Sequence, residues 1–217
     1  MTSTSHVAAA DCERCRPGPI AQPANTVSSL AFTVAGLLLV ARSRRTPTAS
    51  FPPLPATDPP VAEAALGWSA VAAGLGSVAY HGPGTRAGQI LHDATLLAML
   101  ATLITADVAR FTGRPASRAV VAALPGLALA AATSPWSVPA QLVVGTGAVA
   151  AEVARVRGAR SGRRSGRRPA AASVVAAVGA LGHVLGRTGG PLCRPDSVWQ
   201  AHAAWHSAMA FVLVLRD

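Results

Sequence analysis

The stretch SVWQAHAAWHSAMAFVLVL, residues 197–215, decides the fold class of this chain. It has the length and apolarity of a membrane-spanning helix, which needs about 20 mostly apolar residues. It also carries His202 and His206, which are four residues apart and therefore share one face of a helix. Ionisable side chains at membrane depth are costly and usually serve a function. Two imidazoles on one face of such a segment therefore indicate a functional site.

Composition extends this interpretation to the whole chain. Of the 217 residues, 51% are hydrophobic and only 13% are charged, whereas soluble domains carry about 25% charged residues. The apolar residues form long blocks, which is typical of a polytopic membrane protein. All nineteen basic residues are Arg and none is Lys. Because a retinal Schiff base needs a Lys amine, a rhodopsin-type pump is excluded.

The apolar blocks predict an all-α integral membrane protein, a seven-transmembrane helix bundle. Residues 1–24 form an N-terminal segment, and residues 25–217 form a single membrane domain. The N-terminal segment is polar and Pro-rich without a cleavable signal peptide, so the first span is expected to direct insertion. The predicted spans are 26–41, 63–81, 89–109, 118–133, 137–154, 170–186 and 197–215.

The distribution of arginine predicts the orientation, because basic residues favour the cytoplasmic side. Most of them follow the first, third, fifth and last spans, namely Arg42, Arg44, Arg45, Arg110, Arg114, Arg118, Arg155, Arg157, Arg160, Arg163, Arg164, Arg167, Arg168 and Arg216. The other side has only Arg14, Arg16, Arg86, Arg187 and Arg194. We therefore expect the N-terminus outside and the C-terminus in the cytoplasm, which requires an odd number of spans.

The same distribution bears on partners and location. The net charge of +10 lies between apolar blocks, so it indicates topology and anionic-lipid contact, and no nucleic-acid partner is expected. Arg in place of Lys, with abundant Ala, Gly and Pro, is typical of GC-rich coding. We expect a multi-pass protein of a bacterial plasma membrane, and the sequence leaves its oligomeric state open.

All three cysteines fall on the outer side in this topology. An oxidising compartment favours a disulfide between the N-terminal segment and the loop before the last span. The candidates are Cys12 or Cys15 with Cys193. The sequence does not decide between the two N-terminal cysteines.

Polar residues on three spans are expected to meet at one level of the membrane. Ser77 and His81 lie four residues apart at the end of the second span, and a Gly-Pro-Gly turn leads to Asp93 in the third. A short turn between antiparallel helices keeps both ends at one depth, in the outer half of the membrane. The last span runs inward from the outer side, so His202 and His206 belong to the same level.

This set of residues suits a zinc ion. Three imidazoles, from His81, His202 and His206, bind Zn²⁺ and leave a fourth position for water. A carboxylate such as Asp93 can accept a proton from that water, and a hydroxyl such as Ser77 can donate to a developing oxyanion. The alternative is that the histidines form hydrogen bonds between helices without a metal.

Other polar residues lie near the same level. His92 and His183 complete no spacing pattern, and we interpret them as supporting or packing groups. Asn25, Ser28 and Ser29 open the first span. They either cap and pack that helix or contribute to the pocket.

Three islands of this sequence resemble the alkaline ceramidases, within the CREST superfamily of seven-helix membrane hydrolases. They are CE (12–13) with NTVSSLAF (25–32), GLGSVAYH (74–81) followed by QILHD (89–93), and HAAWH (202–206). The resemblance implies an intramembrane zinc held by His81, His202 and His206. It also implies a proton-transfer role for Asp93 and an oxyanion-supporting role for Ser77.

The reaction that the resemblance implies is hydrolysis of a lipid amide by a zinc-activated water. The substrate would be a membrane lipid, ceramide or another N-acyl lipid, and the products a fatty acid and an amine such as sphingosine. The family's outside N-terminus and outer disulfide agree with the predicted topology. The helices here are richer in Ala and poorer in aromatic residues, which leaves the acyl-chain pocket undefined.

The resemblance also implies a calcium site in the N-terminal segment, with Asp11, Glu13 and Asn25 as candidate ligands. Calcium prefers several carboxylates. Here Arg14, Cys15 and Arg16 stand among the candidates, and Gln22 falls where a family carboxylate is expected. These departures argue against calcium.

Two alternatives come from other classes of protein. Paired imidazoles also serve as axial haem ligands, although His202 and His206 share one helix face. A receptor or transporter with a structural metal site would hold the same ion without lipid turnover. A Soret band in the visible spectrum would distinguish a haem protein from a hydrolase. A lipid turnover assay would distinguish a receptor or transporter from a hydrolase.

Overall fold

Seven α-helices form the described part of the chain, which is residues 7–45, 59–112, 116–161 and 167–216 of this computed structural model. The helices are α1 Pro23–Arg45, α2 Pro59–His81, α3 Arg86–Thr112, α4 Arg118–Thr133, α5 Ser137–Ser161, α6 Arg167–Leu185 and α7 Ala201–Leu215. A 3₁₀ turn, Ala9–Asp11, precedes them. The predicted all-α fold class is therefore confirmed.

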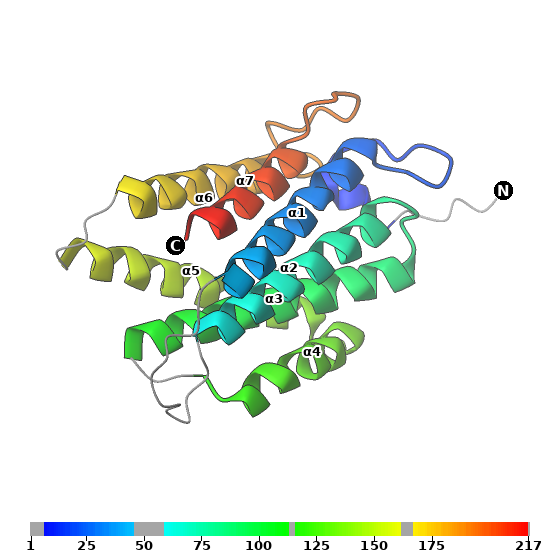
Figure 1. Ribbon diagram of the computed structural model, residues 1–217. Helices are drawn as coiled ribbons and strands as arrows, with labels where there is room; N and C mark the ends of the chain where they lie inside the picture. The colour runs from blue at the N-terminus through cyan, green and yellow to red at the C-terminus, as the bar shows by residue number, and fades with distance from the viewer. Residues whose placement is uncertain (1–6, 46–58, 113–115, 162–166, 217) are drawn as a thin grey trace.

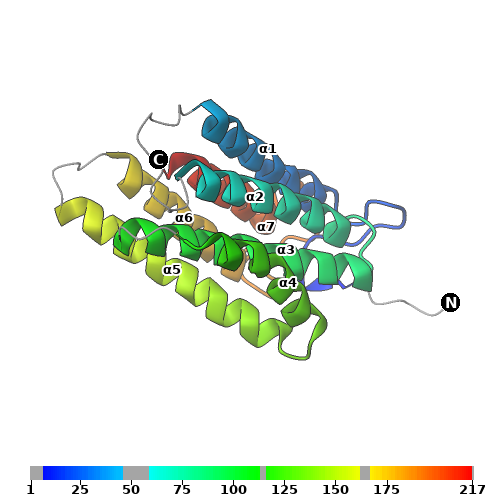
Figure 2. The same cartoon turned by 60° about the horizontal axis from the view of Figure 1, so that its bottom comes forward.

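The helices form one bundle, in which α2 lies between α1 and α3 (Figures 1 and 2). α1 packs between α2 and α7, α6 packs on α7, and α3 packs on α2. α4 and α5 lie on the outer side of α3. Glycines allow the closest approach, since a Cβ at Gly36 would lie 2.4 Å from the carbonyl oxygen of Gly67. Small residues at such crossings are typical of membrane helices.

The apolar surface of the bundle fits a lipid environment. Within the described part of the chain, three helical segments are long and apolar enough to cross a membrane: Pro23–Arg45, Arg86–Ala109 and Ser137–Ala154. On the last of these, Leu142 and Val143 are 66% and 72% exposed. Many other large apolar side chains of the helices are also exposed, which is typical of a surface that contacts lipid or another protein. The chain is therefore consistent with a membrane protein.

One predicted span is wrong at its start. Residues 197–200 are not helical, and α7 begins at Ala201. The reason is a turn after Pro195, in which Gln200 donates hydrogen bonds from Nε2 to the carbonyl oxygens of Arg194 and Ser197. α4 has the predicted bounds. α1, α2, α3 and α5 extend beyond the predicted ranges, and α6 starts three residues earlier and ends one residue earlier than predicted.

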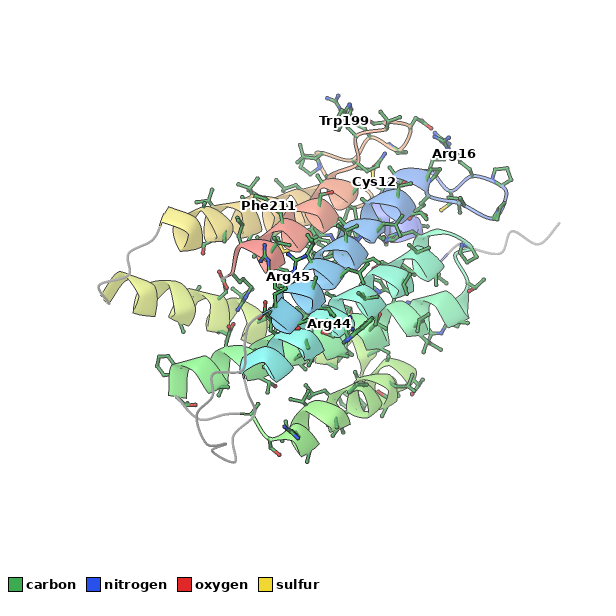
Figure 3. The ribbon with its side chains drawn as sticks, in the orientation of Figure 1. Cys12, Arg16, Arg44, Arg45, Trp199 and Phe211 are labelled. Atoms are coloured by element: carbon green, nitrogen blue, oxygen red, sulfur yellow. A yellow bond between two sulfur atoms is a disulfide. The ribbon has the colours of Figure 1, made fainter. Side chains whose placement is uncertain are left out.

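Basic residues gather at the end of the bundle opposite the N-terminal segment. Figure 3 shows Arg44 and Arg45 at the far end of α1 from Cys12 and Trp199. We call the end with Cys12 the histidine end and the other the arginine end. Arg114, Arg163 and Arg164, which the predicted topology also used, lie outside the described residues, as do most of the Pro-rich linker 46–60 and the centre of the basic loop 159–168.

Candidate metal centre

Three histidines converge at the histidine end of the bundle. One nitrogen from each of His81, His202 and His206 lies within 4.8 Å of the other two. All three side chains are buried, at 0%, 6% and 0% exposure. The sequence therefore predicted a cluster that the structure brings together.

Local structure explains this convergence. His81 is the last residue of α2, and the turn that follows returns the chain at once into α3. His202 and His206 are one turn apart near the start of α7, and their ring centroids are 4.5 Å apart. α1 contacts both α2 and α7, so it brings these two helix ends to the same place. The His81 ring lies 5.0 Å from that of His202 and 5.3 Å from that of His206.

Gln22 determines which ring nitrogen of His81 carries the proton. The Gln22 amide nitrogen donates to the carbonyl oxygens of Ala8 and Glu13, at 2.9 and 2.8 Å. This orients its Oε1 toward Nδ1 of His81, 2.8 Å away. An amide oxygen only accepts hydrogen bonds. Nδ1 of His81 therefore carries the proton and donates, which leaves Nε2 with its lone pair.

The hydroxyl groups of α1 fix His206 in the same way. Ser28 and Ser29 each donate their one hydroxyl hydrogen to the carbonyl oxygen of Asn25, at 3.0 and 2.7 Å. Nδ1 of His206 lies 2.9 Å from Oγ of Ser28 and 3.4 Å from Oγ of Ser29. It is therefore the donor in these contacts. Of the two interpretations of the serines, the structure supports a contribution to the site.

His202 has two partners at its Nδ1 atom. Nδ1 of His183, on α6, lies 3.0 Å away, and Oδ1 of Asp11 lies 3.6 Å away. A carboxylate accepts and does not donate, so it favours a proton on Nδ1 of His202. His183 also lies against the ring of Trp205, with centroids 4.8 Å apart. His183 is thus a supporting group, in line with its interpretation from the sequence.

The donor set fits a transition-metal ion. Nε2 of His202 and Nε2 of His206 are buried and have no hydrogen-bond partner among the described residues. A buried lone pair without a partner costs about 1–3 kcal/mol, and a cation removes that cost. Metal-bound histidines typically donate their other N–H to a carbonyl, carboxylate or other acceptor, and all three rings have such a partner here. Three neutral imidazoles suit zinc, although the donor set alone does not identify the metal.

Asp93 and Ser77 lie on the two helices next to the cluster. Ser77 is buried on α2, one turn before His81. Asp93, on α3, has Nδ1 of its neighbour His92 at 2.9 Å and accepts from Oγ of Ser137 at 3.1 Å. The His92 ring lies 6.4 Å from that of His81. Asp93 therefore belongs to a polar group beside the histidines, and its role in catalysis stays a prediction.

The three calcium candidates have different partners. The Glu13 carboxylate accepts from the backbone N–H groups of Ala24 and Asn25, both at 2.8 Å, and so caps the start of α1. Asp11 faces His202, and the Asn25 amide nitrogen donates to Gln22. Cys12, between Asp11 and Glu13, has a φ of 70°, a left-handed conformation rare outside glycine. That these residues do not bind calcium stays a prediction.

A disulfide between Cys12 and Cys193 ties the N-terminal segment to the loop before α7. The segment is also held by hydrogen bonds from Thr188 Oγ1 to the carbonyl oxygen of Ala9 and from the backbone of Cys12 to Thr188 Oγ1. Cys15 remains a thiol, and burial raises its pKa. We call residues 7–22 together with residues 186–200 the cap, because both segments lie over the histidine end.

Sequence reasoning missed several residues of this region. Gln22, Asp11 as a neighbour of His202, and Ser137 lie in loops or at a helix end, where no periodic pattern places a side chain. At the arginine end, the side chain of Arg216 pairs with both carboxylate oxygens of Asp107 and with Glu152. That group had a signal in the sequence, since Asp107 and Glu152 are carboxylates within apolar spans.

Comparisons with known proteins add no relationship. No family model matches the chain, and neither a curated protein nor a solved structure matches it.

Proposed function

We propose that this protein is an intramembrane zinc-dependent hydrolase of a lipid amide, of the ceramidase-like kind that its sequence resembles. The observation that carries the proposal is the set of three buried imidazoles. Their Nδ1 atoms are held by Gln22, by Ser28, and by His183 with Asp11. Their remaining nitrogens therefore face one another in a site that suits a cation.

The surroundings of the cluster support a lipid as the substrate. The cap covers the end of the bundle that would face water, and the three histidines are at most 6% exposed. Helix α6, which packs on α7 and carries His183, presents apolar residues such as Val178 and Leu181, which are 66% and 59% exposed. A substrate that is itself dissolved in the membrane has the simplest access to such a site. Ceramide and other N-acyl lipids meet this condition.

Each site residue has a defined task in the proposal. Zinc, when bound by His81, His202 and His206, supplies activation of a water molecule and polarisation of the amide carbonyl. Asp93 accepts a proton at its carboxylate, where His92 and Ser137 already orient both oxygens. Ser77 donates its hydroxyl hydrogen to the carbonyl oxygen of the substrate as negative charge develops there.

The proposed orientation follows from charge. All seven helices cross a bacterial plasma membrane, the histidine end faces outward, and the arginine end faces the cytoplasm. The described arginines support this, since Arg42, Arg44 and Arg45 lie in the last turn of α1. Basic residues favour the cytoplasmic side.

The direct test is incubation of the purified, zinc-loaded protein with a panel of N-acyl lipids. The panel should include ceramides, N-acyl amino acids and N-acyl ethanolamines of several chain lengths. We expect mass spectrometry to detect free fatty acid and the matching amine from at least one member. A zinc-loaded protein that releases neither product from any of them contradicts the proposal.

One observation favours a second candidate, a receptor or transporter with a structural metal. Both carboxylate oxygens of Asp93 already have partners, as is typical of groups with a structural role. In that case His81→Ala would lower thermal stability and remove metal, with no lipid turnover to lose. The haem alternative is weaker, because the His202 and His206 rings project from the same face of α7.

A further inference from the structure

Gln22 links the cap to the metal centre through a single side chain. It is fully buried, although it lies in the segment that precedes α1. Its amide nitrogen donates to the cap at the carbonyl oxygens of Ala8 and Glu13, and its amide oxygen contacts His81. Neither the spacing of the histidines nor the resemblance assigns it a role toward the metal.

The nitrogen and the oxygen of the Gln22 amide cannot exchange places without breaking hydrogen bonds. If the amide turned over, its nitrogen would face Nδ1 of His81, and its oxygen would face two carbonyl oxygens. The Glu13 carbonyl oxygen would lose the amide donor, and the Ala8 carbonyl oxygen would keep only the backbone N–H of Asp11. The cap therefore fixes which end of the amide His81 meets.

The consequence for His81 is a fixed tautomer. The fixed acceptor keeps the proton on Nδ1 whether or not a metal is present. It also holds the ring at 2.8 Å from Gln22. In the other tautomer, Nε2 would carry the proton and could not bind an ion until that proton was lost.

We infer that Gln22 is the positioning residue of the metal centre, which holds His81 in its metal-binding tautomer and couples the folded cap to zinc affinity. This inference rests on the proposed zinc site. It does not depend on which lipid, if any, is hydrolysed. Outer hydrogen-bond partners of metal-bound histidines typically contribute 10–100-fold to metal affinity.

Two substitutions separate the acceptor from the rest of the side chain. Gln22→Met removes both the acceptor for His81 and the donor to the cap. Gln22→Glu keeps an acceptor for Nδ1 of His81, but it replaces the donor to the cap by a carboxylate oxygen. A matched control is Gln200→Met: Gln200 is also buried and donates to two carbonyl oxygens of the cap, those of Arg194 and Ser197.

The measurement is zinc affinity, by competition with a chromophoric chelator on the full chain in detergent. We expect Gln22→Met to weaken zinc about 10–100-fold, and Gln22→Glu and Gln200→Met to stay within about threefold of the parent. A Gln22→Met protein that binds zinc like the parent overturns the inference. So does a Gln22→Glu protein as weak as Gln22→Met, since the acceptor would then not be what matters.

A second measurement needs no variant and applies even if Gln22→Met fails to fold. Nitrogen-15 NMR of the zinc-free parent should show the His81 proton on Nδ1, and a proton on Nε2 overturns the inference. Failure of the proposed function looks different. A parent that binds no zinc overturns the metal centre and this inference together, whereas a parent that binds zinc but hydrolyses no lipid overturns only the hydrolase.

Discussion

The two ends of the bundle bury polar groups in different ways. At the arginine end, Arg216 pairs with Asp107, and its Nη1 lies 2.9 Å from Oε2 of Glu152. At the histidine end, each imidazole has a partner at Nδ1, while Nε2 of His202 and of His206 has none among the described residues. At the arginine end, the charges thus compensate one another within the protein. Buried histidine nitrogens that are held in place but have no hydrogen-bond partner are typical of a metal-binding site.

The largest predicted effect is on chemistry at the histidine end. Asp93→Asn keeps a side chain of the same shape but removes the proton acceptor, so lipid hydrolysis should fall by about 10²–10⁴-fold. Zinc content should stay the same, because Asp93 is not one of the three metal ligands. Turnover per bound zinc, with product measured by mass spectrometry, checks this.

The matched control for Asp93→Asn is Asp107→Asn. It removes a carboxylate from the same helix, at about 20 Å from Asp93 by helical rise. It should lower stability and leave turnover per bound zinc unchanged. Undiminished hydrolysis in Asp93→Asn would remove that residue from the mechanism.

The next effect is on stability at the arginine end. Arg216→Met leaves the buried carboxylate of Asp107 and the partly buried carboxylate of Glu152 without this cation, which should cost about 3–5 kcal/mol of unfolding free energy. Replacing Arg216, Asp107 and Glu152 together by Met, Leu and Leu should restore most of that loss, since apolar residues need no partner. Thermal unfolding in detergent provides the measurement.

Zinc content distinguishes the two ends in the same experiment. Every folded Arg216 variant should bind zinc like the parent. Loss of zinc from a variant that is still folded would show that the arginine end supports the metal centre, and the contrast between the ends would fail.

The disulfide of the cap should contribute less. Cys12→Ala removes the bond to Cys193 and should lower the unfolding free energy by about 2–4 kcal/mol. Cys15→Ala is the matched control, since its thiol is not bonded, and it should change stability little. The two variants are compared by thermal unfolding with and without reductant. Equal effects of the two substitutions would contradict the pairing of Cys12 with Cys193.

The smallest effect concerns the exposed pair of Arg14 and Asp196 on the cap. The hydrogen bond from Arg14 lowers the pKa of Asp196 below its usual value. A lowered pKa in the folded state means that the pair stabilises the fold above the ordinary pKa of about 4. That contribution is lost as the pH falls through the lowered value.

Unfolding temperatures between pH 6 and pH 3 test this for the parent and Asp196→Asn. The difference between them should be small at pH 6 and should shrink as the pH falls toward 3. It should also shrink at high salt, since both side chains are largely exposed. A difference that grows as the pH falls would contradict the assignment.

Sequence reasoning worked where a regular spacing fixes geometry. The four-residue spacing of His202 and His206 places both on one face of α7, and the tight turn after His81 returns the chain directly into α3. Apolar blocks predicted every helix end to within four residues, except the end of α5, which lies seven residues beyond the predicted range. Period and hydropathy are local properties, so they can be read without the structure.

The sequence did not predict side chains whose position depends on contacts with distant parts of the chain. Gln22 reaches His81 only because the cap folds over the bundle, and no local pattern encodes that fold. The pairing of Cys193 with Cys12 instead of Cys15 depends on the same loop geometry. The roles of Asp11 and His183 toward His202 likewise appear only when the cap, α6 and α7 are brought together.

The most direct test of the central claim is the zinc content of the purified protein and of its His202→Ala/His206→Ala variant, measured by elemental analysis. The proposed metal centre predicts about one zinc per parent chain and almost none in the variant. A parent without bound metal, or a variant that retains the full amount, would contradict it.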